Sequence, residues 1–141
     1  MDSPRSISVF LPRQLPSRWL SPNRGERKEG RSAMAISNAK REMRAEVCIG
    51  LLAEESVRLI EKPFHRAHVT LTLRWFKRSQ DGLYRPEDAG NAIYALKAAI
   101  DGLVDAGLLV DDDYRNLVKL TGAVERCEAG EEGLLVQVEE L

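Results

Sequence analysis

The sequence contains few of the residue types that define several classes of small protein. Among its 141 residues there are two cysteines and two histidines, and aromatic residues make up 6%. Cys48 and Cys127 stand far apart without a CxxC spacing, which argues against a zinc site and a disulfide scaffold, so we expect both to be small buried residues. His65 and His68 stand three apart at the start of an expected strand, where they point to opposite faces rather than to one metal ion.

Long apolar segments are also missing. No run of 18 apolar residues predicts a membrane span, and the N-terminal segment lacks the apolar stretch and the small-residue cleavage site of a secretory signal. The chain has no internal repeat, no G-x-G-x-x-G motif and no P-loop. With 43% hydrophobic residues, it is long enough to bury a core. We therefore expect a single cytoplasmic domain over residues 1–141.

Charge is unevenly distributed along the chain, although the net charge is −1. Residues 1–44 hold ten Lys and Arg against four acids, and residues 86–141 hold thirteen acids against four bases. Basic side chains neutralise nucleic-acid phosphates, whereas clustered carboxylates hold divalent cations. The pattern is typical of a metal-dependent nucleic-acid enzyme, and also of a basic arm attached to an acidic, solvated globule.

Hydrophobic periodicity predicts four strands and two helices. Apolar alternation predicts strands over residues 6–11, 65–76, 114–124 and 134–138. Helical spacing predicts helices over residues 37–60 and 88–106. Between the first strand and the first helix, prolines interrupt regular structure and residues 12–36 form a basic, Pro- and Gly-rich loop region. This order predicts an α/β (α+β) fold, a small mixed sheet with two main helices packed on one face.

The buried faces of these elements are less fully determined by the pattern. In the strand over 65–76, the inward residues are Val69, Leu71, Leu73 and Trp75, or else their alternating neighbours. In the first helix, the inner face consists of Met43, Val47 and Leu51, or of Cys48 and Leu52, with Val57 further along. In the third strand, Gly122 is interpreted as the mark of a bulge.

The segment 85–113 organises the rest of the chain. Asp88 is suited to cap a helix start, because its carboxylate can accept bonds from free backbone N–H groups. The buried stripe of the helix consists of Ile93, Leu96, Ile100, Leu103 and Val104. A second face carries Tyr94, Lys97 and Asp101. Gly107 is suited to end the helix, because glycine tolerates the left-handed conformation, and Asp88 meets Asp112 only if the chain folds back along it.

The same segment contains a distinctive succession of residues: Asp88-Ala89-Gly90-Asn91, then Lys97, the run from Leu103 to Leu109, and Asp111-Asp112. In this succession it resembles the RusA family of Holliday-junction resolvases, which have an Asp-x-Asp-Asn turn, a helix with a lysine, and a run that ends in aspartates. Weaker similarity, such as Ser21-Pro22-Asn23, extends over most of the chain. The resemblance implies a homodimeric, magnesium-dependent endodeoxyribonuclease that resolves four-way DNA junctions in recombination and repair.

The acids and the lysine are the candidate catalytic residues. Magnesium is usually held by one or two carboxylates together with water and substrate phosphate, and Asp88 and Asp112 are the expected pair, with Asp111 as a further ligand. Lys97 would neutralise charge that develops on a phosphate oxygen. The resemblance implies the same roles for Asp88, Asp112 and Lys97. We expect Mn²⁺ to substitute for Mg²⁺ at these oxygen ligands.

The expected DNA contacts come from two places. The family pattern implies that Asn91 contacts DNA or supports the acids. The loop before the first helix supplies polar and basic residues that meet a phosphate backbone, or are simply solvated: Asn23, Arg24, Arg27 and Lys28.

One position departs from the family pattern. Gly90 stands where the family has its second aspartate, so one metal ligand is missing, and Glu87 or Asp111 would have to replace it. Alternatively, the glycine leaves bare N–H groups that bind phosphate without a catalytic metal. The alternative function is therefore a catalytically weakened junction-binding protein.

Each candidate also has an ordinary structural explanation. Asp88 is explained as a helix cap, Asp111 to Asp113 as an acidic turn, and Lys97 as a solvated partner of Asp101 at i,i+4. A third interpretation, a protein-interaction module, depends on the acidic C-terminal half alone.

Overall fold

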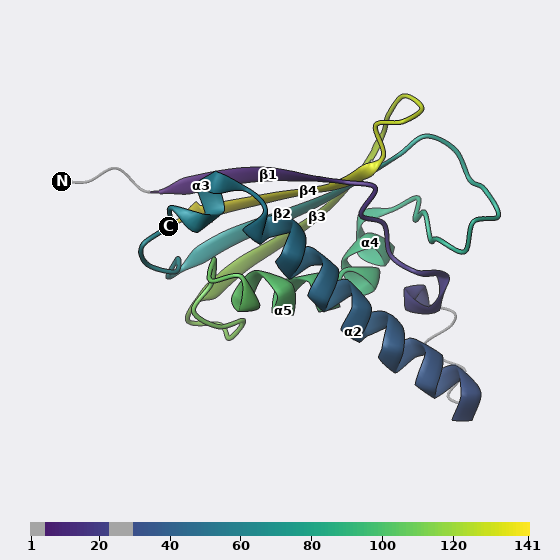
Figure 1. Ribbon diagram of the computed structural model, residues 1–141, viewed down its shortest axis with the longest axis horizontal. Helices are drawn as coiled ribbons and strands as arrows, with labels where there is room; N and C mark the ends of the chain where they lie inside the picture. Colours follow the sequence, from purple (N-terminus) through teal and green to yellow (C-terminus); the bar gives the residue numbers. More distant parts are fainter. Residues whose placement is uncertain (1–4, 23–29) are drawn as a thin grey trace.

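A computed structural model describes residues 5–22 and 30–141 of the chain. Its strands are β1 (Ser6–Pro12), β2 (Ala67–Trp75), β3 (Leu117–Arg126) and β4 (Gly133–Glu140). Its helices are the short 3-10 helix η1 (Arg18–Leu20), α2 (Gly30–Leu52), α3 (Glu55–Arg58), α4 (Ala89–Ala95) and α5 (Lys97–Asp105). Helices α2, α4 and α5 lie along one face of the four-stranded sheet (Figure 1). The predicted α/β fold with a small mixed sheet is confirmed.

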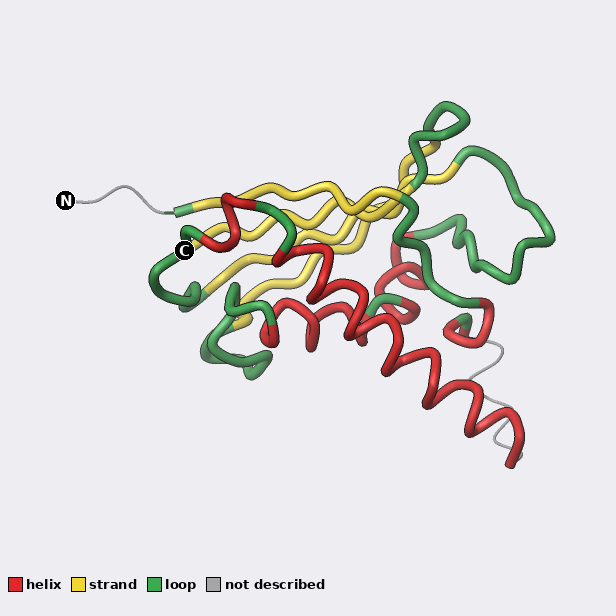
Figure 2. Tube along the Cα trace, viewed as in Figure 1, coloured by secondary structure: helices red, strands yellow, loops and turns green. Residues whose placement is uncertain are grey.

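The sheet has the strand order β1-β4-β2-β3 (Figure 2). Strand β4 pairs antiparallel with both β1 and β2, and β2 pairs parallel with β3. Parallel neighbours need a crossover connection, which α4 and α5 supply here. On β2, Val69, Leu71 and Leu73 are at most 1% exposed. The first of the two predicted inward sets is therefore the correct one, because the helices cover that face.

The first helical region is longer and less continuous than the sequence pattern indicates. Helix α2 begins at Gly30, so the predicted loop region over 12–36 ends earlier than expected. The helix ends at Leu52, whose carbonyl accepts a hydrogen bond of 2.7 Å from Arg58, and α3 follows as a separate turn. The single helix predicted over 37–60 is therefore wrong. Its inner face was correctly given by the first set, since Met43, Val47 and Leu51 are all buried.

The central segment also forms two helices where one was predicted. The break falls at Leu96, which has φ −99° and ψ 6°. Its N–H bonds to the carbonyls of both Ala92 and Ile93, so the chain tightens there toward 3-10 geometry. No glycine or proline marks the position, and the apolar spacing continues across it, so periodicity gave no sign of the break. Gly107, with φ +84°, ends the second helix region as predicted.

Two glycines allow the helices to approach their neighbours closely. A Cβ added to Gly122 of β3 would lie 2.9 Å from the carbonyl oxygen of Ala89 and well inside the Ile93 side chain. A Cβ on Gly102 of α5 would lie 2.9 Å from the carbonyl oxygen of Arg44 on α2. Helix α4 therefore packs directly against the backbone of β3 at Gly122. Gly122 pairs regularly with Leu71, and the register shift of this strand pair falls between Ala67 and His68, so the bulge interpretation of Gly122 is wrong.

A buried arginine fixes the connection that leads from β2 to α4. Arg85 is 8% exposed, and its guanidinium donates to both carboxylate oxygens of Asp81, at 2.9 and 2.8 Å, and to Glu132 at 2.9 Å. The indole N–H of Trp75 donates to the carbonyl of Pro86 at 2.8 Å. These contacts hold the chain immediately before Asp88, the first residue of the candidate site.

Three smaller features complete the comparison with the sequence. Cys48 and Cys127 are half-buried and unpaired, not buried as expected. Strand β3 begins at Leu117, later than predicted, because Asp113 accepts hydrogen bonds from the backbone N–H groups of Arg115 and Asn116 and closes a turn. In the described part of the chain, no helix combines the length and apolar character needed to cross a membrane.

Candidate functional site

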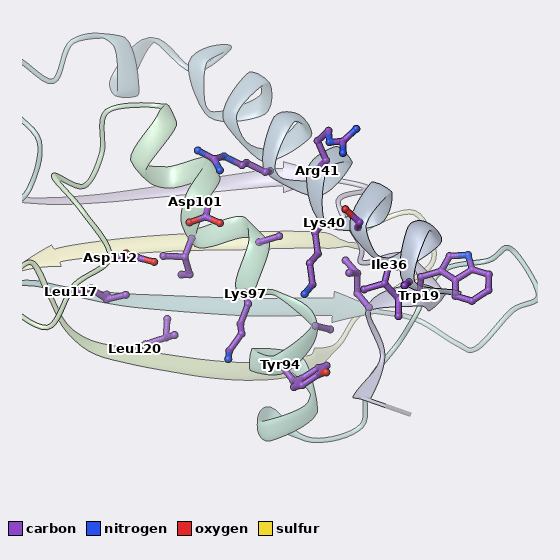
Figure 3. Close-up of a pocket in the computed structure, with 17 residues that line it drawn as sticks. Trp19, Ile36, Lys40, Arg41, Tyr94, Lys97, Asp101, Asp112, Leu117 and Leu120 are labelled. Atoms are coloured by element: carbon purple, nitrogen blue, oxygen red, sulfur yellow. The ribbon is translucent and has the colours of Figure 1, made fainter. Parts of the chain in front are cut away.

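A cleft of about 960 Å³ opens between α2 on one side and α4, α5 and β3 on the other (Figure 3). Its lining contains charged side chains of both signs: Lys40, Arg41, Arg44, Lys97, Asp101 and Asp112. The apolar lining comes from η1, α2, α5 and β3. The central segment thus contributes to the cleft twice, once from its helices and once from the loop that returns to the sheet.

The face predicted to carry Tyr94, Lys97 and Asp101 lines this cleft. Tyr94 is 46% exposed near the end of α4, and Lys97 is the exposed first residue of α5. All three side chains border the cleft although the helix breaks at Leu96 between Tyr94 and Lys97 (Figure 3).

The cleft has one acidic side. Asp101 of α5 and Asp112 of the following loop both line it, and Figure 3 shows them on the same side of Lys97. Burial raises the pKa of Asp112 above its usual range, and the neighbouring carboxylates of Asp111 and Asp101 raise it further. Asp111 also accepts the backbone N–H of Asp112 at 2.7 Å. Carboxylates crowded in this way favour a proton or a cation between them.

Asp88 has a different environment. Its carboxylate caps α4, with one oxygen 2.8 Å from the backbone nitrogen of Asn91 and the other 2.9 Å from the side-chain nitrogen of Asn91. It does not line the cleft, and it is not among the groups that shift the pKa of Asp112. Lys97 and Asp112 therefore line one cleft, which Asp88 does not line.

Gly90 stands where the RusA-like pattern would have a second aspartate, and its surroundings have room for a side chain. An added Cβ would meet only a carboxylate oxygen of Asp88, at the ordinary contact distance of 3.4 Å. Glu87, one candidate substitute, forms an ion pair of 2.9 Å with Arg78. Asp111, the other, lies beside Asp112. The acid that the sequence analysis missed is Asp101, which was assigned only as a partner of Lys97.

The opposite side of the cleft is basic. Lys40 and Arg41 project from α2, and Figure 3 shows Lys40 extending toward the same space as Lys97. Arg44 is held by Asp105 through contacts of 2.6 and 2.9 Å, which raise the pKa of Arg44 and lower that of Asp105. The helical spacing that marks Met43, Val47 and Leu51 as inward residues leaves Arg41 and Arg44 on the outer face of α2. It gave no sign that part of this face borders a cleft, because amphipathicity separates buried from exposed residues only.

Four predicted DNA-binding residues, Asn23, Arg24, Arg27 and Lys28, lie outside the described residues. Trp19 and Leu20, from the earlier part of the predicted loop region over 12–36, do line the cleft. The guanidinium of Arg18 lies 5.1 Å from the centre of the Trp19 ring.

The donor set can be compared with the needs of magnesium. Mg²⁺ is commonly bound by one or two carboxylates and completes its octahedron with water and substrate phosphate. Asp101 and Asp112 offer two carboxylates to one cleft, and burial together with the neighbouring carboxylates raises the pKa of Asp112. Among residues 5–22 and 30–141, no group of three or more acidic, histidine or cysteine side chains could hold a metal ion. The described residues fit a cation shared with water and phosphate, and not one enclosed by protein ligands.

No protein-family model matches the sequence, and no curated protein matches it. The functional argument therefore depends on the cleft and on the resemblance of the central segment.

Proposed function

We propose that this protein is a RusA-like, magnesium-dependent, structure-selective endodeoxyribonuclease that cuts four-way DNA junctions. The observation that carries the proposal is the cleft in which Lys97 and Asp112, spaced along the chain as the RusA family spaces its lysine and its last aspartate, lie with Asp101 opposite a basic helix face. A nuclease needs both signs of charge in one place, because cations hold phosphates and carboxylates hold the metal.

The roles of the residues follow from their positions. Asp112 and Asp101 would hold Mg²⁺, while the predicted further ligand, Asp111, accepts the backbone N–H of Asp112. The bound ion would polarise the scissile phosphate and lower the pKa of a bound water. Lys97 presents an exposed ammonium group to the same cleft and would neutralise charge on a phosphate oxygen. Asp88 caps α4 and orients Asn91, and we retain both as candidates that reach the substrate from the edge of the site.

A junction-binding protein without hydrolytic activity is the second candidate. It is favoured by the absence of a carboxylate at Gly90 and by the engagement of both Asp88 oxygens with Asn91. The proposed phosphate cradle at Gly90 has less support, because Asp88 already accepts the N–H of Asn91. In either case the partner is branched DNA. We also propose a homodimer and a cytoplasmic setting, since a two-fold dimer presents two equivalent surfaces to a junction.

The proposal is tested by measuring cleavage of a synthetic four-way junction over a series of Mg²⁺ and Mn²⁺ concentrations. A linear duplex of the same sequence is the control substrate. We expect metal-dependent cutting of the junction and little cutting of the duplex. Mn²⁺ should support more activity than Mg²⁺ at equal concentration, because it binds the same oxygen ligands more tightly. If the protein binds the junction but cuts it with neither ion, the nuclease proposal fails and the binding protein remains.

A further inference from the structure

The nuclease chemistry described above gives Tyr94 no role and leaves open which form of DNA the basic side of the cleft binds. We propose that the cleft between α2 and α4 binds an unpaired stretch of DNA strand, in which Lys40 and Arg41 contact the phosphates and Tyr94 stacks on a base. The inference rests on the proposed function only in taking DNA as the ligand. It adds the strand state that the protein recognises and the residues that recognise it.

The cations are available for a ligand. Lys40 and Arg41 are exposed on α2, and neither forms an ion pair with another residue of the described chain. Arg44, one turn further along, contrasts with them because Asp105 holds its guanidinium. Together with Lys97, these two cations, which form no ion pair within the described residues, give the cleft lining an excess of positive charge. A polyanionic backbone is the ligand that such a groove attracts.

Tyr94 supplies the second observation. Its ring is 46% exposed and lines the same cleft as the cations, where Figure 3 shows it close to Lys97. The faces of bases in a duplex are covered by their stacked neighbours, so an exposed aromatic ring reaches a base face only where the base is unpaired or extruded. A positively charged groove with an aromatic platform is the usual construction of sites for single strands.

The apolar wall of the cleft fits the same ligand. Leu117 and Leu120 of β3 and Ile36 of α2 line it together with the charged groups, and Leu120 is 36% exposed. A nucleotide presents an apolar base face and a charged phosphate to such a mixed surface. The acids on the other side repel phosphates, so the backbone should follow α2 and the base should turn toward Tyr94.

Fluorescence anisotropy in EDTA measures this binding without any cleavage. The probes are a labelled single strand of about 20 nucleotides, a four-way junction and a linear duplex. The variants are the pair Lys40→Gln and Arg41→Gln made together, and a matched control pair, Lys62→Gln with Lys119→Gln, which removes two exposed lysines outside the cleft. We expect the double variant Lys40→Gln with Arg41→Gln to bind the single strand and the junction more weakly than the wild type does. For the single strand, the slope of log affinity against log salt should fall in magnitude by about 1.4, which is about 0.7 for each lost phosphate contact. The control pair should leave that slope near the wild-type value.

The base contact is tested with Tyr94→Leu and Tyr94→Phe. Loss of stacking should weaken single-strand affinity at least about fivefold without changing the salt slope, and phenylalanine should restore it. Tyr114→Leu is the control, since Tyr114 is 79% exposed and does not line the cleft. Circular dichroism of each variant verifies that it is folded.

The outcomes separate this inference from the nuclease proposal. If the wild type cuts junctions but the cleft variants bind DNA like their controls, the inference is wrong and the nuclease stands. If the cleft variants lose single-strand binding although no metal supports cutting, the inference holds without the nuclease. Tighter binding to linear duplex than to the single strand, or binding of an acidic peptide such as polyglutamate in preference to DNA, would overturn the inference.

Discussion

The packing of α4 against the sheet at Gly122 can be tested by adding a single methyl group to this glycine. In Gly122→Ala, the new Cβ falls within the space of the Ile93 side chain, 2.8 Å from its Cδ1, and 2.9 Å from the backbone oxygen of Ala89. Rotation of Ile93 relieves only the first contact, so the backbone of α4 must also move by a few tenths of an ångström. Overpacking of this kind costs about 1–3 kcal/mol of unfolding free energy.

Urea unfolding followed by tryptophan fluorescence measures this cost. The matched control is Gly90→Ala, where the added Cβ meets only an Asp88 oxygen at 3.4 Å. Because that glycine lies in the first turn of α4, alanine should leave stability unchanged or raise it by up to about 1 kcal/mol. A double variant, Gly122→Ala with Ile93→Ala, should be more stable than the sum of the single effects predicts, with a coupling of about 0.5–3 kcal/mol.

The same variant should also affect function, because α4 carries both Asp88 and Tyr94. A displaced α4 should weaken binding of single-stranded DNA in the cleft, whereas Gly90→Ala should not. If Gly122→Ala is as stable as the wild type and additive with Ile93→Ala, α4 does not rest on the sheet at Gly122. The account of how the sheet positions these two residues would then be wrong.

Three further predictions concern pH, metal and assembly. The hydrogen-bonded ion pair with Arg85 lowers the pKa of Asp81 in the folded protein. The ion pair therefore contributes its full stability above the ordinary carboxyl pKa of about 4, and this contribution is lost progressively as the pH falls below about 4. Asp81→Asn should therefore cost about 1 kcal/mol in urea unfolding at pH 7, since the carboxylate is partly exposed, and less at pH 3; an equal cost at both values would refute the pairing. Gly90→Asp adds a carboxylate beside Asp88, outside the cleft in which Asp101 and Asp112 would hold the ion, so it should leave the Mg²⁺ concentration needed for half-maximal junction cleavage unchanged; a lower Mg²⁺ requirement in Gly90→Asp but not in Gly90→Asn would place the metal at Asp88 instead. Sedimentation should give a dimer of the 15.8 kDa chain, and a monomer both with and without DNA would contradict this expectation.

The fold was predictable because its strands are regular. Alternation of apolar residues limited the buried side of β2 to two sets, and helical spacing limited the inner face of α2 to two sets. The structure selects Val69, Leu71 and Leu73 in β2, and Met43, Val47 and Leu51 in α2. These patterns report burial, which is what they depend on physically. They do not report where a helix breaks, and the turn at Leu96 arises from hydrogen bonding without any glycine or proline.

The candidate site was predictable only in part, for a similar reason. The helical spacing correctly placed Tyr94, Lys97 and Asp101 on one face, because they lie close together in sequence. Lys40 and Arg41 come from a helix more than 50 residues earlier, and periodicity shows only that they are exposed. Gly122 was misinterpreted because a glycine in a strand indicates either a bulge or a close approach, and only the position of α4 decides between them.

The central claim is that Asp112 holds, in the cleft, the Mg²⁺ ion that is needed to cleave a DNA phosphodiester. The most direct measurement is the rate at which Asp112→Asn cuts a four-way junction in Mg²⁺, beside Asp113→Asn as the matched control. Asp113 is the adjacent acid, but its carboxylate is engaged with Asn116 in the turn and does not line the cleft. The account predicts that Asp112→Asn lowers the cleavage rate at least about 100-fold while junction binding in EDTA is retained, and that Asp113→Asn keeps most of the activity. Equal activity of the two variants, or loss of cleavage in Asp113→Asn alone, would contradict it.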